Sequence, residues 1–387
     1  MYDSTDMLDF KKKQKRKKQL IRVVLILLLL AGAAAAYLTQ ELWLPKIRNF
    51  NRQYQTIIND GALAEGNFPI MINSGADYQI DYSGNYLTVL SDSTVYFYSD
   101  EGGLIKHIQH AYTNPVMLSA SGRALLYERG GDEFCLEDAN NTLYEKRFND
   151  RKIMFARLSE EGYTAVVTTS EKYHCEIIVY DRKGASIYER KCVELVNDIS
   201  FREGSEGCVI SYVYAENGSL VTSVQNVDFT KDGELWSSPG LDTFGLDVYS
   251  YSGGAFLVGI DACGYVDNAG NITSFFRYEA DLAGGASCNG QSAVILNNEE
   301  RRQYTAVLFD GGGREPVLVG LASPLIDVHV EDGLAYVMTS DAIFAYDFTG
   351  TLRSTAQVND SYTGFERSQK HIYLKSFNKI DRIDYNS

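Results

Sequence analysis

The residue type best suited to acid–base or metal chemistry, histidine, is scarce in this chain and does not cluster. The five histidines are His107, His110, His174, His329 and His371. His107 and His110 are three residues apart in an expected strand, which points their side chains to opposite faces and prevents them from sharing a metal ion. His174 lies near an expected loop and needs distant ligands to bind a metal, and the remaining two stand alone. The histidines therefore predict no metal or catalytic centre.

The six cysteines include no CxxC motif and no regular spacing, so they do not predict a disulfide framework. Cys135 and Cys175 fall in or beside apolar strand patterns and are expected to be small core residues. A bond between Cys192 and Cys208 is the alternative that the spacing leaves open.

Acidic neighbours and a glycine run complete the search for reactive groups. Asp132-Glu133 and Glu160-Glu161 form a hydrolase pair only if folding brings them together. Gly311-Gly312-Gly313 follows one expected strand and precedes another, so it predicts a hairpin turn and not a phosphate loop. The chain also has no nucleophile elbow and no zinc-protease motif. The sequence therefore indicates no catalytic, cofactor-binding or metal-binding residues.

One residue type recurs with a fixed period, and it points to the elements that organise the chain. Eight times a short β-type run ends at an aspartate and a turn. These aspartates are Asp100, Asp138, Asp181, Asp228, Asp267, Asp310, Asp347 and Asp384, at intervals of 38, 43, 47, 39, 43, 37 and 37 residues. A period near 40 residues is typical of a four-stranded propeller blade.

The residues after each aspartate explain the turn. Three positions later stands Gly103, Asn141, Gly184, Gly270, Gly313 or Gly350, and in the fourth repeat the spacing stretches to Gly233. An aspartate carboxylate can accept backbone N–H groups within a turn, and glycine or asparagine tolerates a left-handed φ. Each aspartate is therefore expected to mark the hairpin from the third to the fourth strand of a blade, which is a structural role.

The two ends of the repeat region predict a closed ring. The last unit stops after Asp384 and lacks an outer strand, whereas an unused β-type segment, Phe68 to Ile72, precedes the first unit. A strand borrowed from the beginning of the chain would close the circle and hide its edges. We predict an all-β fold, an eight-bladed β-propeller, with seven blades as the alternative. A solenoid or a pair of β-sandwiches does not explain eight turns in register.

The turns Tyr180-Asp181-Arg182-Lys183-Gly184 and Tyr346-Asp347-Phe348-Thr349-Gly350 resemble those of quinoprotein-like and WD40-like propellers. The whole layout resembles a bacterial family of membrane-anchored, propeller-like proteins of unknown function, and this resemblance implies no activity. Quinone-dependent dehydrogenases repeat a docking tryptophan in most blades, whereas this chain has Trp43 and Trp236 alone. No cofactor is therefore expected.

The N-terminal region predicts a membrane anchor. Val23 to Leu38 has no charge, and with Leu20 to Arg22 it gives about 28 Å of helix, close to the ~30 Å hydrocarbon core of a bilayer. The basic block Lys11 to Lys18 precedes it and predicts a cytoplasmic N-terminus. A signal peptide cleaved after Ala33 to Ala36 is the alternative. The expected domains are a tail (1–19), a transmembrane helix (20–38), a juxtamembrane linker with a short amphipathic helix (39–66) and an extracytoplasmic propeller (67–387).

The charge of the chain is divided sharply between its two ends. Residues 1–22 contain 8 of the 36 basic residues and 3 of the 51 acidic residues. The rest of the chain therefore has 28 basic and 48 acidic residues, which is a net charge of −20. Such a domain should repel nucleic acid and anionic lipid. We therefore expect a single-pass protein of the cell membrane whose propeller binds an envelope protein, a wall polymer or a small ligand. The alternative is a glycan or peptide hydrolase or lyase with its site at the channel mouth.

Overall fold

The computed structural model describes residues 67–72, 77–231 and 233–384. The chain divides into compact units of residues 1–55 and 56–387, and all described residues belong to the second. The predicted tail, transmembrane helix and juxtamembrane linker (1–19, 20–38 and 39–66) lie outside the described residues. Within the described ranges, no helix has the length and apolar character needed to cross a bilayer.

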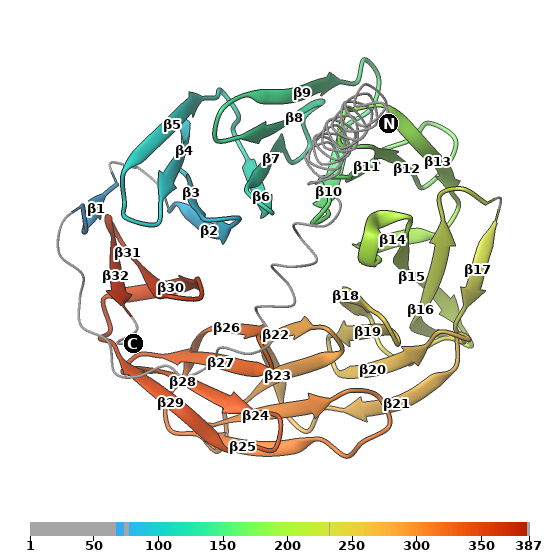
Figure 1. Cartoon of the computed structure of the whole chain (residues 1–387). Helices are drawn as coiled ribbons and strands as arrows, with labels where there is room; N and C mark the ends of the chain where they lie inside the picture. The colour runs from blue at the N-terminus through green and yellow to red at the C-terminus, as the bar shows by residue number, and fades with distance from the viewer. Residues whose placement is uncertain (1–66, 73–76, 232, 385–387) are drawn as a thin grey trace, which may run out of the picture. The chain divides into compact units, whose positions relative to one another are not determined.

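The second unit contains eight antiparallel four-stranded sheets arranged in a ring (Figure 1). This confirms the all-β, eight-bladed prediction over the seven-bladed alternative. The first blade contains β2 (Gln79–Ser83), β3 (Tyr86–Leu90), β4 (Thr94–Ser99) and β5 (Leu104–Gln109), and the second contains β6 (Pro115–Ala120), β7 (Arg123–Glu128), β8 (Glu133–Asp138) and β9 (Thr142–Arg147). The third blade contains β10 (Ile153–Leu158), β11 (Thr164–Thr168), β12 (Cys175–Tyr180) and β13 (Ser186–Cys192). The fourth contains β14 (Leu195–Phe201), β15 (Gly207–Glu216), β16 (Ser219–Asp228) and β17 (Glu234–Ser237).

The remaining four blades continue the same order. The fifth blade contains β18 (Gly245–Tyr251), β19 (Gly254–Gly259), β20 (Ala262–Asp267) and β21 (Ile272–Arg277), and the sixth contains β22 (Asp281–Cys288), β23 (Gln291–Asn298), β24 (Gln303–Asp310) and β25 (Val317–Leu321). The seventh blade contains β26 (Leu325–Glu331), β27 (Leu334–Thr339), β28 (Ala342–Asp347) and β29 (Leu352–Gln357). The eighth contains β30 (Tyr362–Arg367), β31 (His371–Ser376) and β32 (Lys379–Asp384), together with β1 (Ile70–Met71). One 3₁₀ helix, Glu203–Ser205, connects β14 to β15.

The ring closes through a strand from the beginning of the propeller. β1 pairs antiparallel with β32, with Ile70 opposite Ile380. Directly before β2, the Tyr78 hydroxyl lies 2.7 Å from the carbonyl oxygens of both Ser376 and Lys379 and shares its one hydrogen between them. Both ends of the described chain thus meet in one blade, as the unused segment before the first unit predicted.

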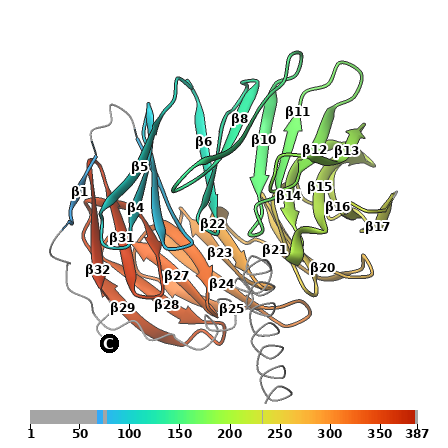
Figure 2. The same ribbon diagram turned by 45° about the horizontal axis from the view of Figure 1, so that its top comes forward.

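The hydrophobic core is divided among the blade boundaries. Eight buried clusters each join two neighbouring blades, and one of them packs Phe68, Ile70 and Ile72 against Tyr373 and Ile380. Because both faces of every blade are covered, the middle strands read as continuous apolar runs such as Ala-Val-Val in β11. The tilt of the blades around the ring is visible in Figure 2.

Candidate functional site

The repeated aspartates lie where the third strand of a blade turns into the fourth. In three regular turns the carboxylate accepts the backbone N–H groups two and four residues later, at 2.8–2.9 Å. These are Asp181 with Lys183 and Ala185, Asp267 with Ala269 and Asn271, and Asp347 with Thr349 and Thr351. Asp138 and Asp228 cap shorter or looser versions of this turn. Asp310 instead accepts a hydrogen bond from Gln291 and pairs with Arg314. Asp384 ends β32.

The glycines of these turns have the left-handed φ that the sequence predicts, except in the first blade. Gly184, Gly233, Gly270, Gly313 and Gly350 have φ between 80° and 90°. In the first blade the left-handed residue is Gly102, not Gly103, and the Ser99 hydroxyl accepts the Gly103 N–H at 3.1 Å. Ser99 therefore stands where the other turns have aspartate. Asp100 comes one residue later and accepts the Tyr82 hydroxyl at 2.8 Å.

Inward-facing strands carry a second set of aspartates that the repeat pattern did not reveal. Each accepts a backbone N–H from the innermost strand of the following blade. The pairs are Asp81 with Ser119, Asp198 with Val248 and Asp327 with Phe365, at 2.9, 2.9 and 3.2 Å. We call these contacts the interblade clasps. They join residues 38 to 50 positions apart, so no local spacing identifies them.

Two of the clasps belong to a titratable cluster that spans the seventh, eighth and first blades. His329 Nε2 lies 3.4 Å from Asp327 Oδ2, and the two side chains keep 29% and 33% of their surface exposed. Burial favours neutral imidazole, but the Glu366 and Asp327 carboxylates outweigh it and raise the pKa of His329 to about 9. Burial raises the pKa of Asp81 to about 6 and holds the pKa of Glu366 well above its ordinary value. Sequence reasoning missed this cluster because its members come from three separate blades.

The other histidines do not assemble into a site. His107 lies beside the Tyr96 ring, and His110 contacts the Ser91 carbonyl oxygen at 3.3 Å, with its pKa lowered by burial. His174 is exposed and His371 is buried in β31. Among the described residues, no group of three or more histidine, cysteine or acidic side chains is arranged to hold a metal ion.

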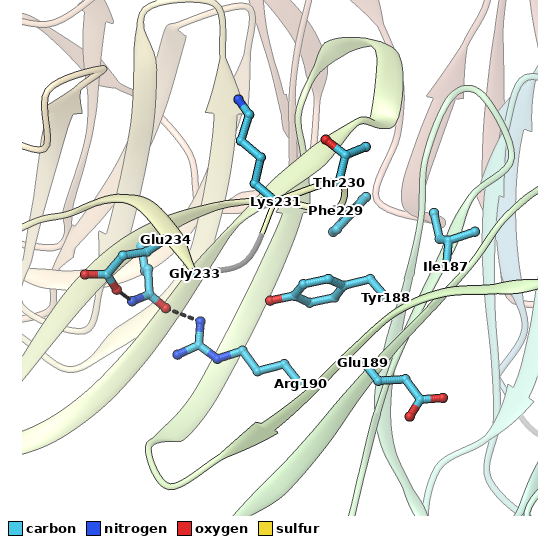
Figure 3. Close-up of a pocket in the computed structure, with 10 residues that line it drawn as sticks. Ile187, Tyr188, Glu189, Arg190, Phe229, Thr230, Lys231, Gly233 and Glu234 are labelled. Carbon is cyan, nitrogen blue, oxygen red and sulfur yellow. Dashed lines mark hydrogen bonds between the residues drawn. The ribbon is translucent and has the colours of Figure 1, made fainter.

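A recess of about 600 Å³ lies at the outer edge of the ring between the third and fourth blades. We call it the edge pocket (Figure 3). One wall is β13, from Ile187 to Arg190, and the other is the turn between β16 and β17. The Tyr188 and Phe229 rings meet with their centroids 5.2 Å apart, and burial raises the pKa of Tyr188.

A polar chain crosses the edge pocket. Arg190 donates to the Gln225 side-chain oxygen, and the Gln225 amide donates to Glu234, as the dashed lines in Figure 3 mark. An aromatic pair beside a few fixed polar groups suits the binding of a small polar ligand. A second recess of about 600 Å³, between the first and second blades, holds Cys135, whose pKa burial raises to about 12. A thiol with such a pKa stays protonated near neutral pH and is a poor nucleophile.

Large apolar side chains are exposed together at one end of the fourth and fifth blades. Val193, Leu195, Leu220, Leu246 and Ile260 form this apolar patch. The alternating strand directions place all five on the face where β14, β16 and β18 begin and where β19 turns into β20. The Asn197 side-chain amide, in the fourth blade, donates to the Gly245 carbonyl oxygen, in the fifth blade, and so connects the two blades at this end. Within the fifth blade, the Ile260 N–H donates to the Phe244 carbonyl oxygen. The other exposed apolar side chains of the blades are mostly spread along the outer strands, as at Leu104, Leu318 and Leu352.

Solved structures share the fold of this chain. A computationally designed protein, Ika8, matches with a TM-score of 0.60 and 12% identity, over 86% of this chain and 99% of its own. BamB from Moraxella catarrhalis matches with a TM-score of 0.53 and 12% identity, over 84% and 100%. At these identities the likeness shows the propeller fold alone. No curated protein matches the sequence.

One family model matches part of the sequence. The match extends from residue 65 to residue 237, through the closing strand and the first four blades. This part of the chain, which includes the edge pocket, is similar to the family described as a family of unknown function (DUF5711).

Proposed function

We propose that this chain is a membrane-anchored, extracytoplasmic β-propeller that serves as a scaffold for a protein partner in the cell envelope. The apolar patch is the observation that carries this proposal. Val193 and Ile260 keep 66% and 58% of their surface exposed, Val193 directly after β13 and Ile260 directly after β19. Exposed apolar side chains gathered on one face are typical of protein interfaces, because their burial stabilises association.

The partner's chemistry follows from the surroundings of the patch. The chain beyond the anchor has a net charge of −20. Glu194 stands between Val193 and Leu195 in the sequence, and Glu216 ends β15 on the same face. A surface with an apolar centre and a basic rim would complement it. A wall polymer or a free small ligand offers less apolar surface for these side chains to bury.

Cross-linking and co-purification from membranes test the scaffold role with the full chain. Val193→Glu and Ile260→Glu should abolish capture of a partner that the unmodified chain retains. Phe377→Glu is the matched control, because Phe377 is 85% exposed on the same face but in the eighth blade. Equal capture by all three variants, or no partner captured by the unmodified chain, contradicts the proposal.

The anchor and its orientation have an independent test. Externally added protease should degrade residues 67–387 on intact cells while the basic tail stays protected. N-terminal sequencing of the membrane-bound protein distinguishes a retained anchor from a signal peptide cleaved near Ala36. A protein that is resistant in intact cells and degraded only after lysis contradicts the extracytoplasmic placement.

The titratable cluster supports a second candidate, a hydrolase or lyase that acts on extracellular glycan or peptide. His329 with its raised pKa could donate a proton while the ionised Asp327 acts as a base, and these are the two roles that acid–base hydrolysis needs. Cleavage of wall glycan or peptide by the purified chain, lost in His329→Gln, supports this candidate. Asp150→Asn serves as the control, at an exposed carboxylate between β9 and β10.

A further inference from the structure

The third blade contains a pair of thiols that neither the scaffold role nor the turn pattern explains. Cys175 opens β12 and Cys192 ends β13, and the two stand directly opposite each other in the antiparallel ladder. Directly opposite residues of such a ladder have Cα atoms about 4.5–5.5 Å apart, within the ~4.4–6.8 Å range of disulfides. Both side chains are buried, in the core cluster that also contains Cys208.

We propose that Cys175 and Cys192 form a disulfide by thiol–disulfide exchange, and that this bond fixes the outer strand β13 that makes one wall of the edge pocket. Cys192 is the last residue of that strand, and Arg190, two residues earlier, begins the polar chain across the pocket. A bond at this point would hold the end of β13 against β12, where the strand passes into the exposed Val193.

The electrostatics of the pair assign the roles of its two thiols. The interaction with Cys192 lowers the pKa of Cys175 and raises that of Cys192, so Cys175 is the thiol that ionises first. The Cys192 Sγ also donates to the Arg190 carbonyl oxygen at 4.0 Å. The corresponding pair suggested by sequence spacing, Cys192 with Cys208, joins residues on β13 and β15, which are not paired strands.

The reaction consumes one external disulfide, such as oxidised glutathione or an oxidised dithiol protein of the envelope. The Cys175 thiolate attacks one sulfur of that disulfide, forms a mixed disulfide and expels the first thiolate. The Cys192 thiolate then attacks the Cys175 sulfur, forms the intramolecular bond and expels the second. The two protons released by the cysteines protonate the two leaving thiolates, so the pair is oxidised and the external disulfide is reduced to two thiols.

Peptide mapping of the full chain in detergent tests the assignment. After incubation with oxidised glutathione, alkylation and digestion without reductant, a peptide linking Cys175 to Cys192 should appear, while Cys263 remains alkylated. A link between Cys192 and Cys208, or full alkylation of both Cys175 and Cys192 after oxidation, overturns the proposal. This readout uses the unmodified chain and is independent of partner binding.

Stability and hydrogen exchange test the consequence for β13. Oxidation should raise the melting temperature by several degrees and slow amide exchange in residues 186–192 at least tenfold. Cys175→Ser and Cys192→Ser should each lose both effects, and Cys263→Ser, a buried cysteine with Phe276 opposite it, should keep them. Unchanged exchange in residues 186–192 of the mapped disulfide form overturns the proposed effect on the pocket wall.

Discussion

Single carboxylates in this propeller act across blade boundaries, and Asp198 is the most deeply buried aspartate of the three interblade clasps. It is 3% exposed, accepts the Val248 N–H at 2.9 Å and pairs with Arg157 Nη2 at 2.6 Å. Its role is structural, because a buried backbone N–H that loses its acceptor costs about 1–3 kcal/mol.

Asp198→Ala should therefore lower the free energy of unfolding by about 2–4 kcal/mol, because Val248 and Arg157 both lose their partner. Chemical denaturation of the purified chain measures the change. Asp150→Ala is the control, since the Asp150 side chain is 73% exposed and should matter by less than about 0.5 kcal/mol. Equal effects of the two substitutions would show that the clasp contributes nothing.

His329 gives a pH prediction at the same scale. Its pKa is raised to about 9 by Glu366 and Asp327 despite its burial, whereas an unfolded histidine titrates near 6.5. The protonated His329 ring therefore stabilises the folded chain fully below about pH 6.5, and this contribution is lost as pH rises through 9. NMR titration should find the His329 ring still protonated at pH 8. His329→Gln should remove this part of the decline in stability at alkaline pH, and an ordinary titration near 6.5 would refute the raised pKa.

The hairpins between third and fourth strands are the repeated elements of the fold, and the seventh blade gives the sharpest case. Asp347 accepts two backbone N–H groups and pairs with Arg353. Burial alone would raise the pKa of Asp347, but these hydrogen bonds lower it to about 2. The stabilisation from this turn is therefore present above about pH 4 and is lost as pH falls through 2.

Gly350 tests the backbone of that element. Its φ is +80°, and an added Cβ would lie 2.7 Å from Val317 Cγ1. Gly350→Ala should therefore lower the free energy of unfolding by about 1–3 kcal/mol. Gly320→Ala is the matched control, because Gly320 lies in β25, has an ordinary φ and has open space around its Cβ position. Thermal unfolding of the two variants compares them directly, and equal melting temperatures would contradict the argument.

At the scale of the whole ring, stability depends on closure by β1. Ile70 is 6% exposed within the cluster that joins the eighth and first blades, whereas Met71 on the opposite face of the same strand is 59% exposed. Ile70→Asp should lower the free energy of unfolding by about 3 kcal/mol or more, since it buries an unpaired charge at the closing seam.

Met71→Asp changes the same strand to the same residue type and should cost less than about 0.5 kcal/mol. Hydrogen exchange should show faster opening of β30–β32 in Ile70→Asp and normal protection in Met71→Asp. If both variants retain native protection in these strands, the ring does not depend on the borrowed strand.

The sequence by itself determined the architecture, because a propeller repeats local events. An aspartate and a glycine three residues apart produce their turn through hydrogen bonds that span four residues, as at Asp181 and Gly184. The eight repeats of this turn predicted the number of blades, and the unmatched segment Phe68 to Ile72 predicted the closing strand. Even so, one local register was wrong, since Ser99 caps the first turn in place of Asp100.

Only the tertiary structure decided which distant residues meet. The clasps join Asp198 to Val248 and Asp327 to Phe365 across blade boundaries, and the cluster around His329 draws on three blades. Cys175 lies opposite Cys192 because the β12–β13 hairpin sets that register, whereas the sequence predicted no disulfide framework and left a Cys192–Cys208 bond as an alternative. Such contacts depend on the tilt and packing of whole sheets. Hydrogen bonds and charges that act through space leave no periodic trace along the chain.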